Sequence, residues 1–230
     1  MQRILLASAS ALAFLAAVPA LAQDNDSTVT QTGTDAVATV TQSGSAAAST
    51  VTQGGDNNAA TVTQSGNGAE SIVLQDNGTG GGSNASDDNN SATIDQTGDS
   101  YSRVRQYNDN ADAQVTQNGD GNSSDILQTG DNDDAFVDQQ GSDLTSTIAQ
   151  SGNSNDANVS QSGDTNQSGI IQSSGANVAI VTQEGSLNES SILQNGLGLN
   201  TANVEQTGED NDSQITQGGI VNDAGDDATV

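Results

Sequence analysis

A glutamine that recurs every eleven residues is the feature that most constrains how this chain folds. From Gln31 to Gln217 the step departs from eleven at only three places, the longest being the interval between Gln75 and Gln96. A valine or isoleucine stands two residues before every one of these glutamines, and a glycine usually follows two residues after. A disordered linker has no reason to keep such a phase, so the repeat predicts regular structure.

The position four residues before each glutamine shows that the true period is doubled. It alternates between serine and alanine without a break, as at Ser146 and Ala157. The unit is therefore about 22 residues with two different halves, Ser-x-Ile-x-Gln-x-Gly and Asn-x-Ala-x-Val-x-Gln-x-Gly. The alternation stays in phase from Ser71 to Ala92. The long interval thus predicts an enlarged turn over residues 76–89 and no missing repeat.

A spacing of two is the period of a β-strand, so the repeated side chains of each half share one face. The segments rich in Gly, Asn and Asp between them are typical of turns. Strand, turn, strand and turn in 22 residues make one rung of a stacked parallel coil. The predicted fold is all-β, a cross-β solenoid of about nine 22-residue rungs, whose last rung is completed by Ala224 or Ala228. At a strand spacing of about 4.8 Å, nine rungs form a rod roughly 40 Å long.

Stacked rungs align like residues in ladders, and these are the candidate functional residues. The apolar surface buried within one rung is too small to offset the conformational entropy lost when the rung folds. We expect backbone and side-chain amide hydrogen bonds to neighbouring rungs to supply the remaining stabilisation. The predicted glutamine ladder is Gln31, Gln42, Gln53, Gln64, Gln75, Gln96, Gln106, Gln117, Gln128, Gln139, Gln150, Gln161, Gln172, Gln183, Gln194, Gln206 and Gln217. The predicted aliphatic ladder is Val51, Val62, Ile126, Val137, Ile148, Val159, Ile170, Val181, Ile192, Val204 and Ile215. The repeat asparagines are Asn58, Asn122, Asn155, Asn166, Asn177, Asn188 and Asn211.

The first 22 residues predict a secretory signal peptide. Arg3 precedes an apolar run over 4–18, and Ala20 to Ala22 form a small-residue cleavage signal. We expect cleavage after Ala22, a mature chain of 23–230, and no membrane span, because no second apolar run follows.

Composition excludes several function classes. The formal net charge is -27, and the chain has no His, Cys or Lys. Nucleic-acid binding needs a basic footprint, which is absent. We expect no cofactor and no His or Cys metal site, and a serine nucleophile would lack its usual base, so no enzyme activity is predicted.

Three segments resemble more specific sites, and each also has a structural explanation. Residues 120–125 resemble half of a calcium loop, although Asn122 and Ser124 fall on repeat positions. The acidic segment 131–134 predicts a solvated corner that could hold divalent cations loosely. The 76–89 turn, with Asp87 and Asp88, stands where β-helix lyases and hydrolases carry catalytic loops, but a tolerated insertion explains it.

Two further surface patterns have simple explanations. Arg103 and Arg105 are expected to point outward and pair with neighbouring acids. Outward threonines resemble the flat arrays of ice-binding solenoids, but they divide between two faces with two rungs on each. These threonines are Thr28, Thr30, Thr39, Thr41, Thr50, Thr52, Thr61 and Thr63.

The repeat unit resembles the curlin repeat of bacterial curli fibre subunits. Close instances run from Ser49 to Gln64 and from Ser146 to Gln161, and the resemblance covers about residues 25–224. The chain departs from that family in having about nine repeats in place of five and no Gly-rich segment before the first.

The resemblance implies a secreted functional amyloid, a fimbria-like fibre on the cell surface that serves adhesion and biofilm matrix. Its implied partners are further copies of itself, a paralogous curlin subunit and outer-membrane export machinery. Because the repeats run to both ends of the chain, we expect open end rungs that polymerise by strand addition. The alternative is a soluble secreted β-solenoid that binds ice, divalent cations or glycans.

Overall fold

The computed structural model describes residues 24–76, 89–196, 199–218 and 227–229. All regular structure in these residues is β-strand. The predicted signal peptide and most of the predicted enlarged turn lie outside the described residues. Within the described part, no helix is long and apolar enough to cross a membrane.

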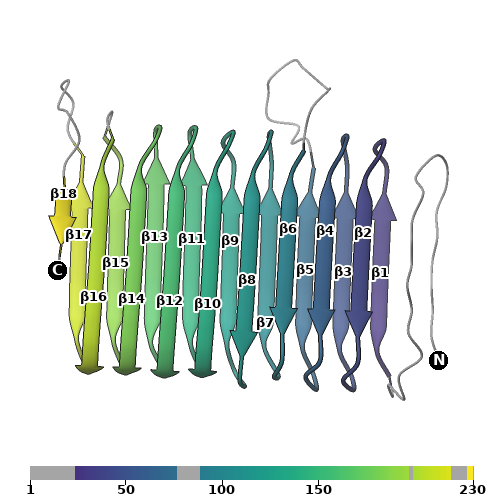
Figure 1. Ribbon diagram of the computed structural model, residues 1–230, viewed down its shortest axis with the longest axis horizontal. Coiled ribbons are helices and arrows are strands. Elements are labelled where there is room, and N and C mark those ends of the chain that lie inside the picture. The colour runs from purple at the N-terminus through teal and green to yellow at the C-terminus, as the bar shows by residue number, and fades with distance from the viewer. Residues whose placement is uncertain (1–23, 77–88, 197–198, 219–226, 230) are drawn as a thin grey trace.

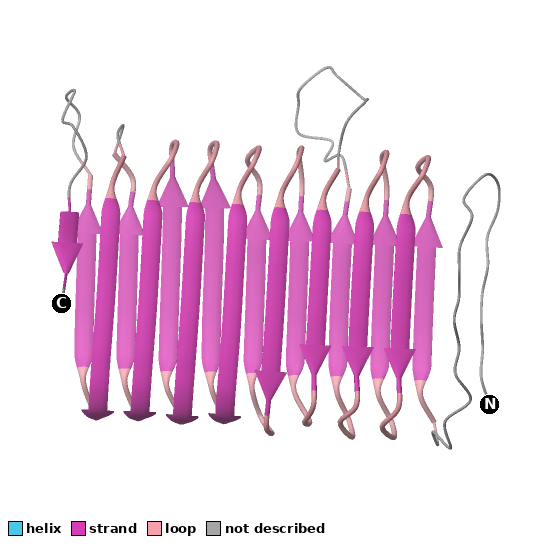
Figure 2. Cartoon of the chain, viewed as in Figure 1, coloured by secondary structure: helices cyan, strands magenta, loops and turns pink. Residues whose placement is uncertain are grey.

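The strands form two parallel nine-stranded sheets, which we name the odd sheet and the even sheet after the strand numbers (Figure 1). The odd sheet contains β1 (Asp26–Gln31), β3 (Ala48–Gln53), β5 (Glu70–Gln75), β7 (Tyr101–Gln106), β9 (Ser123–Gln128), β11 (Thr145–Ser151), β13 (Gln167–Ser173), β15 (Glu189–Gln194) and β17 (Asp212–Gln217). The even sheet contains β2 (Val37–Gln42), β4 (Ala59–Gln64), β6 (Ser91–Gln96), β8 (Asp112–Asn118), β10 (Asp134–Ser142), β12 (Asp156–Asp164), β14 (Val178–Ser186), β16 (Thr201–Glu209) and β18 (Asp227–Thr229). Figure 2 shows the chain passing from one sheet to the other at every turn.

Each strand pairs with the strand one repeat further along, in the register that the sequence alternation predicts. The serine halves stack on one another in the odd sheet, where Ser27 pairs with Ser49. The alanine halves stack in the even sheet, where Val62 pairs with Ile94 across the long interval without a slip. The predicted all-β solenoid of about nine rungs is therefore confirmed. The last even strand uses Ala228, which pairs with Ala202.

The core is a single thin layer between the sheets. Along each strand alternate side chains are buried, so a six-residue strand such as β9 contributes Ser124, Ile126 and Gln128 inward. The central aliphatic row is almost completely inaccessible to solvent from Val51 to Ile215. This explains how a chain with only 31 % hydrophobic residues has a continuous core.

The turns explain why glycine follows the repeat glutamines. Gly163 has φ of +109°, and a Cβ added to it would lie 2.0 Å from the carbonyl oxygen of Gly185 on the next rung. Turn backbones of successive rungs therefore stack too closely for a side chain. Elsewhere non-glycine residues hold left-handed conformations, among them Leu187 with φ of 58°.

Candidate functional site

The glutamine side chains bond to one another in two unbroken rows, one in each sheet. Gln150 is representative: its Nε2 donates to Oε1 of Gln172 on the next rung at 3.0 Å and to the carbonyl oxygen of Asp134 at 2.7 Å. One side chain thereby joins its own strand, the next rung and the start of a strand in the other sheet. From Gln31 to Gln194, every repeat glutamine donates to the glutamine one rung further along.

The direction of these bonds is the same throughout. The Nε2 group always donates towards the C-terminal end of the stack, and Oε1 accepts from the N-terminal side. Among the described residues, no glutamine donates to Oε1 of Gln31 or Gln42, which lie in the first rung. The glutamine rows therefore give the stack a chemical polarity.

The asparagines form shorter rows that run in the opposite direction. Asn177 donates from Nδ2 to Oδ1 of Asn155 on the preceding rung at 3.0 Å, and its backbone N–H donates to the same oxygen at 3.3 Å. Asn188 bonds to Asn166 in the same manner, and Asn211 bonds to Asn188. Where the next rung lacks asparagine, only the backbone bond remains, as from Leu144 N–H to Oδ1 of Asn122. Asn58 accepts from the backbone N–H of Asn90 on the next rung, whose side chain donates instead to the carbonyl oxygen of Asn108.

The predicted asparagine set omits three members of these rows. Asn25 accepts from the backbone N–H of Ala47, Asn90 accepts from that of Ala111, and Asn200 donates to Asn177. Each stands two residues before a repeat serine or alanine, so its position in the repeat could have identified it. These asparagines join the rows because strand register decides which side chains meet, even where the surrounding motif is incomplete.

The aliphatic ladder residues all lie in the core. Each of the predicted residues from Val51 to Ile215 is at most 4 % exposed. The same row also contains Val73, Ile94, Val104 and Val115, which were omitted from the prediction although they share the position two residues before glutamine. Val29 and Val40 in the first rung pack against this core but are only partly buried.

The ends of the stack repeat the pattern of its interior. β1 and β17 are the edge strands of the odd sheet, and β2 and β18 are those of the even sheet. β17 faces the core with Ser213, Ile215 and Gln217, and β1 faces it with a serine, a valine and a glutamine at the same positions. A parallel strand added at either edge could therefore continue the same rows.

The acidic segment 131–134 is accessible to solvent, as the sequence predicts, except at Asp133. Asp133 is fully buried, because it occupies an asparagine position in the even sheet. Its Oδ1 accepts from the backbone N–H of Asn155 at 2.9 Å and from Nδ2 of Asn155 at 3.0 Å. Its Oδ2 is buried without a well-formed hydrogen bond. Burial raises the pKa of Asp133 to about 6, although the bonds from Asn155 and the nearby backbone N–H of Gly130 oppose the shift.

The two arginines on β7 lie on the outer face of the odd sheet and pair with an acid, as expected. Arg103 bonds to both carboxylate oxygens of Asp125 on β9, and Nη2 of Arg105 lies 3.1 Å from Oδ1 of the same residue. Burial alone would raise the pKa of Asp125, but the two arginines outweigh it and hold the pKa below its ordinary value. The hydrogen bond to Asp125 raises the pKa of Arg103.

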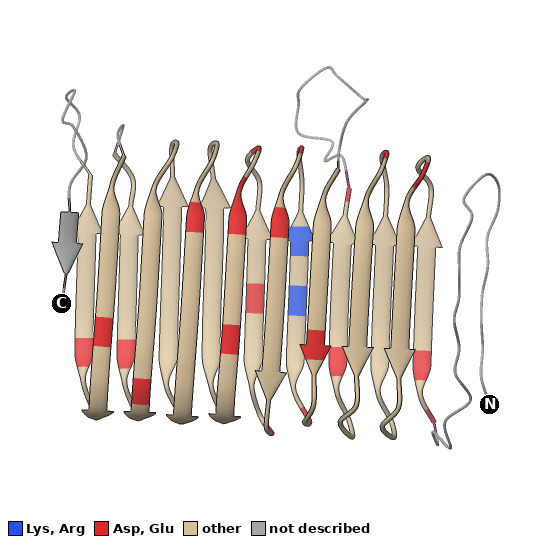
Figure 3. Ribbon diagram, viewed as in Figure 1, with Lys and Arg blue, Asp and Glu red and all other residues tan. Residues whose placement is uncertain are grey.

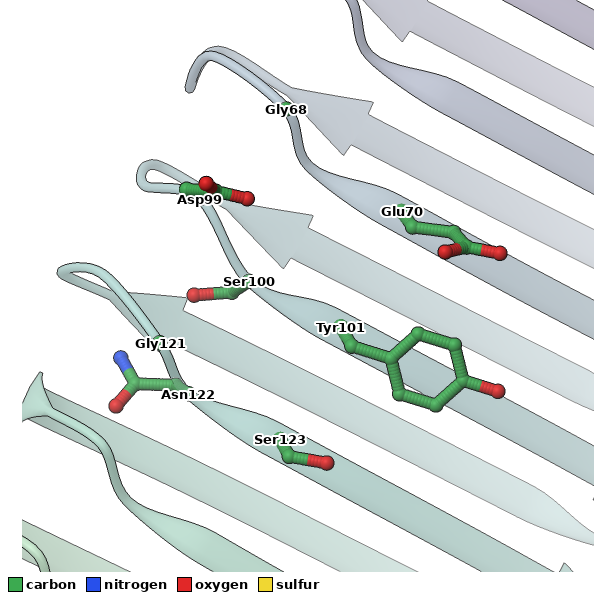
Figure 4. Close-up of a pocket in the computed structure, with 8 residues that line it drawn as sticks. All are labelled: Gly68, Glu70, Asp99, Ser100, Tyr101, Gly121, Asn122 and Ser123. Carbon is green, nitrogen blue, oxygen red and sulfur yellow. The ribbon is translucent and has the colours of Figure 1, made fainter.

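Residues 120–125 are used internally and do not form a calcium loop. Asn122 donates to the carbonyl oxygen of Gly141 at 3.0 Å, and Ser124 donates to Oγ of Ser102 at 3.1 Å inside the core. A shallow pocket lies beside them where β5, β7 and β9 begin (Figure 4), and Glu70 and Tyr101 are adjacent on its strands. Among the described residues, no group of three or more acidic side chains is arranged to hold a metal ion.

The threonine pairs are divided between the two sheets, as the sequence predicts. In the odd sheet the pairing of Thr28 with Thr50 is followed by Ile72. In the even sheet Thr63 is followed by Asp95. Neither face therefore continues a two-column array of threonines beyond its first rungs.

Comparison with known proteins identifies the repeat. A family model described as the curlin associated repeat matches residues 33–66, 108–141, 123–152 and 130–163. These regions begin and end within the rungs described above and include members of the glutamine, aliphatic and asparagine rows. No curated protein matches the chain.

Proposed function

Because the chain belongs to the curlin-repeat family, we propose that it is a structural subunit of extracellular curli-like amyloid fibres. The observation that carries the proposal is the pair of odd-sheet edge strands, β1 and β17, which present the same rows of side chains as the interior. Parallel strands adding to these edges would extend the backbone ladder and the glutamine rows together. The role is mechanical and not catalytic.

Head-to-tail addition follows from how incomplete the first rung is. Val29 and Val40 are only partly buried there, whereas the equivalent residues of the next rungs are inaccessible to solvent. A second copy that places β17 against β1 would cover Val29. Gln217 of that copy would stand in register with Gln31 and supply the amide that an interior glutamine accepts from. Because the two surfaces in contact differ, the assembly does not close and a filament results.

Export and surface attachment are part of the same proposal. Residues 1–22 act as a secretory signal peptide, and the mature subunit of 23–230 reaches the cell surface through outer-membrane export machinery. There the fibre contributes to adhesion and biofilm matrix. A paralogous curlin subunit is a further partner, because any chain with the same row spacing could present a matching end rung. Mass spectrometry of secreted protein tests the processing site, since the N-terminal residue should be Gln23.

The central test is assembly of purified 23–230. Fibres should form, bind amyloid dyes and diffract at the strand spacing of about 4.8 Å along their axis. Salt should accelerate assembly, because it screens the repulsion between subunits of net charge -27. Protein that stays monomeric for weeks at high salt would refute the proposal.

A variant of the edge strand tests the mode of growth. Val29→Lys places a charge where strand addition would bury it, so seeded elongation should slow at least about tenfold. Thr30→Lys is the matched control, because it makes the same charge change on the same strand at an exposed position. Equal elongation rates for the two variants would show that β1 is not an assembly surface.

A further inference from the structure

The outer face of the odd sheet carries a row of apolar side chains, which we name the aliphatic stripe. Its members stand immediately before the repeat glutamines on successive strands from β5 to β15. In order they are Leu74, Leu127, Ala149, Ile171 and Leu193, with the stem of Arg105 between the first two. Ile171 is 51 % exposed. Every strand from β9 to β15 contributes an apolar side chain to the row, so it forms a surface and not a set of scattered residues.

The even sheet has no such stripe at the equivalent position. There the residues before the glutamines are Asp95, Thr116, Asp138, Ser160, Thr182 and Glu205. Figure 3 shows acidic residues distributed over β6, β8, β10 and β12, whereas both arginines lie on β7. The aliphatic row is thus confined to one of the two outer faces of the solenoid.

Charge distinguishes the two faces as well. Between β7 and β15, the outward charges of the odd sheet are Arg103, Arg105, Asp125 and Glu189, which cancel. Every charged residue that points outward from β6 to β12 of the even sheet is acidic. In a chain of net charge -27, β7 to β15 of the odd sheet are therefore a region whose outward strand charges cancel, and Asp26, Glu70 and Asp212 lie outside it.

Two copies of this face can also pack against each other with their stacking directions reversed. β11 of one copy then lies over β11 of the other, β9 lies over β13, and the two stripes face each other. In that arrangement Leu127 of one copy lies opposite Ile171 of the other, and the arginines of β7 approach Glu189. Gly169 borders Ile171 and leaves open space above its Cα, since a Cβ there would meet nothing within 4 Å. Glu70 and Asp212 meet at the rim, where water screens them. The three central strands, β9 to β13, therefore place apolar stripe residues of one copy against apolar stripe residues of the other.

We propose that two filaments of this chain pair laterally, odd sheet against odd sheet, through the aliphatic stripe. The proposal rests on the proposed function, because the stripe is small in a single copy. Five strands with three outward residues each cover about 500 Å² per copy, below the roughly 800 Å² per partner of a stable complex. Along a filament the same contact recurs at every subunit, so many weak contacts act together. Isolated subunits should therefore not dimerise through this face, whereas filaments should pair.

Mass per length of assembled fibres tests the pairing. Nine rungs span about 43 Å, so a paired fibre should contain two chains in each such length and a single filament one. The variant Leu127→Thr/Ile171→Thr/Leu193→Thr keeps strand-forming residues but removes the stripe, and its fibres should have half the wild-type mass per length. Seeded elongation should stay within about twofold of wild type, because the end rungs are unchanged.

Matched variants separate the stripe from hydrophobicity in general. Phe136→Thr/Ile180→Thr removes outward apolar side chains from the even sheet and should leave the fibres paired. Glu189→Lys should separate the filaments, because it places like charge against the arginines, whereas Glu205→Lys should not. Wild-type fibres with one chain per repeat length, or paired fibres of the triple variant, would overturn the proposal. A wild-type chain that forms no fibres would instead refute the proposed function.

Discussion

Replacing Asp133 with asparagine should stabilise the protein at neutral pH and leave it unchanged in acid. The native side chain stands in an asparagine row, buried, with Oδ1 bonded to Asn155 and Oδ2 unsatisfied. An asparagine would keep the oxygen that accepts from Asn155. In the rows, asparagine Nδ2 donates to carbonyls four residues back and nineteen residues ahead, as Asn155 does. For an asparagine at position 133, the corresponding acceptors are the carbonyl oxygens of Thr129 and Gly152.

The size of the effect follows from the pKa of Asp133. Burial raises it from 3.8 to about 6, so the folded state binds its proton more tightly than the unfolded state does. Unfolding free energy is therefore at its maximum below pH 4 and falls as the pH rises to about 6. A shift of this size corresponds to about 3 kcal/mol lost above pH 6. Asparagine cannot ionise, so Asp133→Asn should recover that amount at pH 8 and nothing at pH 4.

Guanidinium denaturation at pH 4 and pH 8 measures the difference. The midpoint of Asp133→Asn should exceed that of wild type only at the higher pH. Asp212→Asn is the control, because it removes the same charge from an exposed strand position and should shift both midpoints little. If Asp133→Asn gave the same gain at both pH values, packing and not ionisation would be the cause. If it gave no gain at pH 8, the buried carboxylate would not be a destabilising group.

Three further substitutions test the turns and the amide rows. Gly163→Ala should lower the unfolding free energy by at least about 2 kcal/mol, because φ at Gly163 is positive and the next rung leaves no room for a Cβ. In the same denaturation assay, Gly169→Ala should be neutral or slightly stabilising, because a Cβ there meets nothing. Gln150→Leu should cost about 2–4 kcal/mol, because it leaves the buried Oε1 of Gln172 without its glutamine donor and removes the bond to the carbonyl oxygen of Asp134. The exposed Ser151→Ala provides the baseline. Leu187→Asn should raise the thermal midpoint by the equivalent of about 1 kcal/mol, because leucine is strained at φ of 58° and asparagine is not; Leu199→Asn, which is equally exposed, should not.

Much of the fold could be predicted from the sequence because the repeat fixes both local structure and register. The spacing of two between Ser146, Ile148 and Gln150 gives the strand and its buried face. The serine–alanine alternation gives the pairing, since it decides which strands belong to one sheet. It also carries the register across the interval between Gln75 and Gln96, where step length alone is ambiguous.

What could not be predicted depends on the environment of single positions within the stack. Asp133 reads as part of an acidic corner, and only the pairing with neighbouring rungs shows that its side chain replaces an asparagine. Asn25, Asn90 and Asn200 belong to the rows although the motif around them is imperfect. The aliphatic stripe uses one residue from each serine half, so it becomes a surface only when all serine halves are placed in one sheet. A local sequence pattern describes one strand at a time. The burial of Asp133, the asparagine rows and the aliphatic stripe depend on contacts between strands.

The opposed directions of the amide rows bear on how the subunits join. Glutamine amides donate towards the C-terminal end of the stack, and asparagine amides donate towards the N-terminal end. A head-to-tail junction keeps both directions, and in the odd sheet it lets Gln217 donate to Gln31 of the next copy. A junction between two N-terminal ends would place Oε1 groups of Gln31 and Gln42 against their copies, acceptor against acceptor, with the strands no longer parallel in register. Such a contact leaves buried amide oxygens without donors, and each one then costs the free energy of its lost hydration. The exchange of one hydrogen bond for another carries no such cost. The rows therefore select one orientation at every junction, and fibres with mixed polarity along one filament should not form.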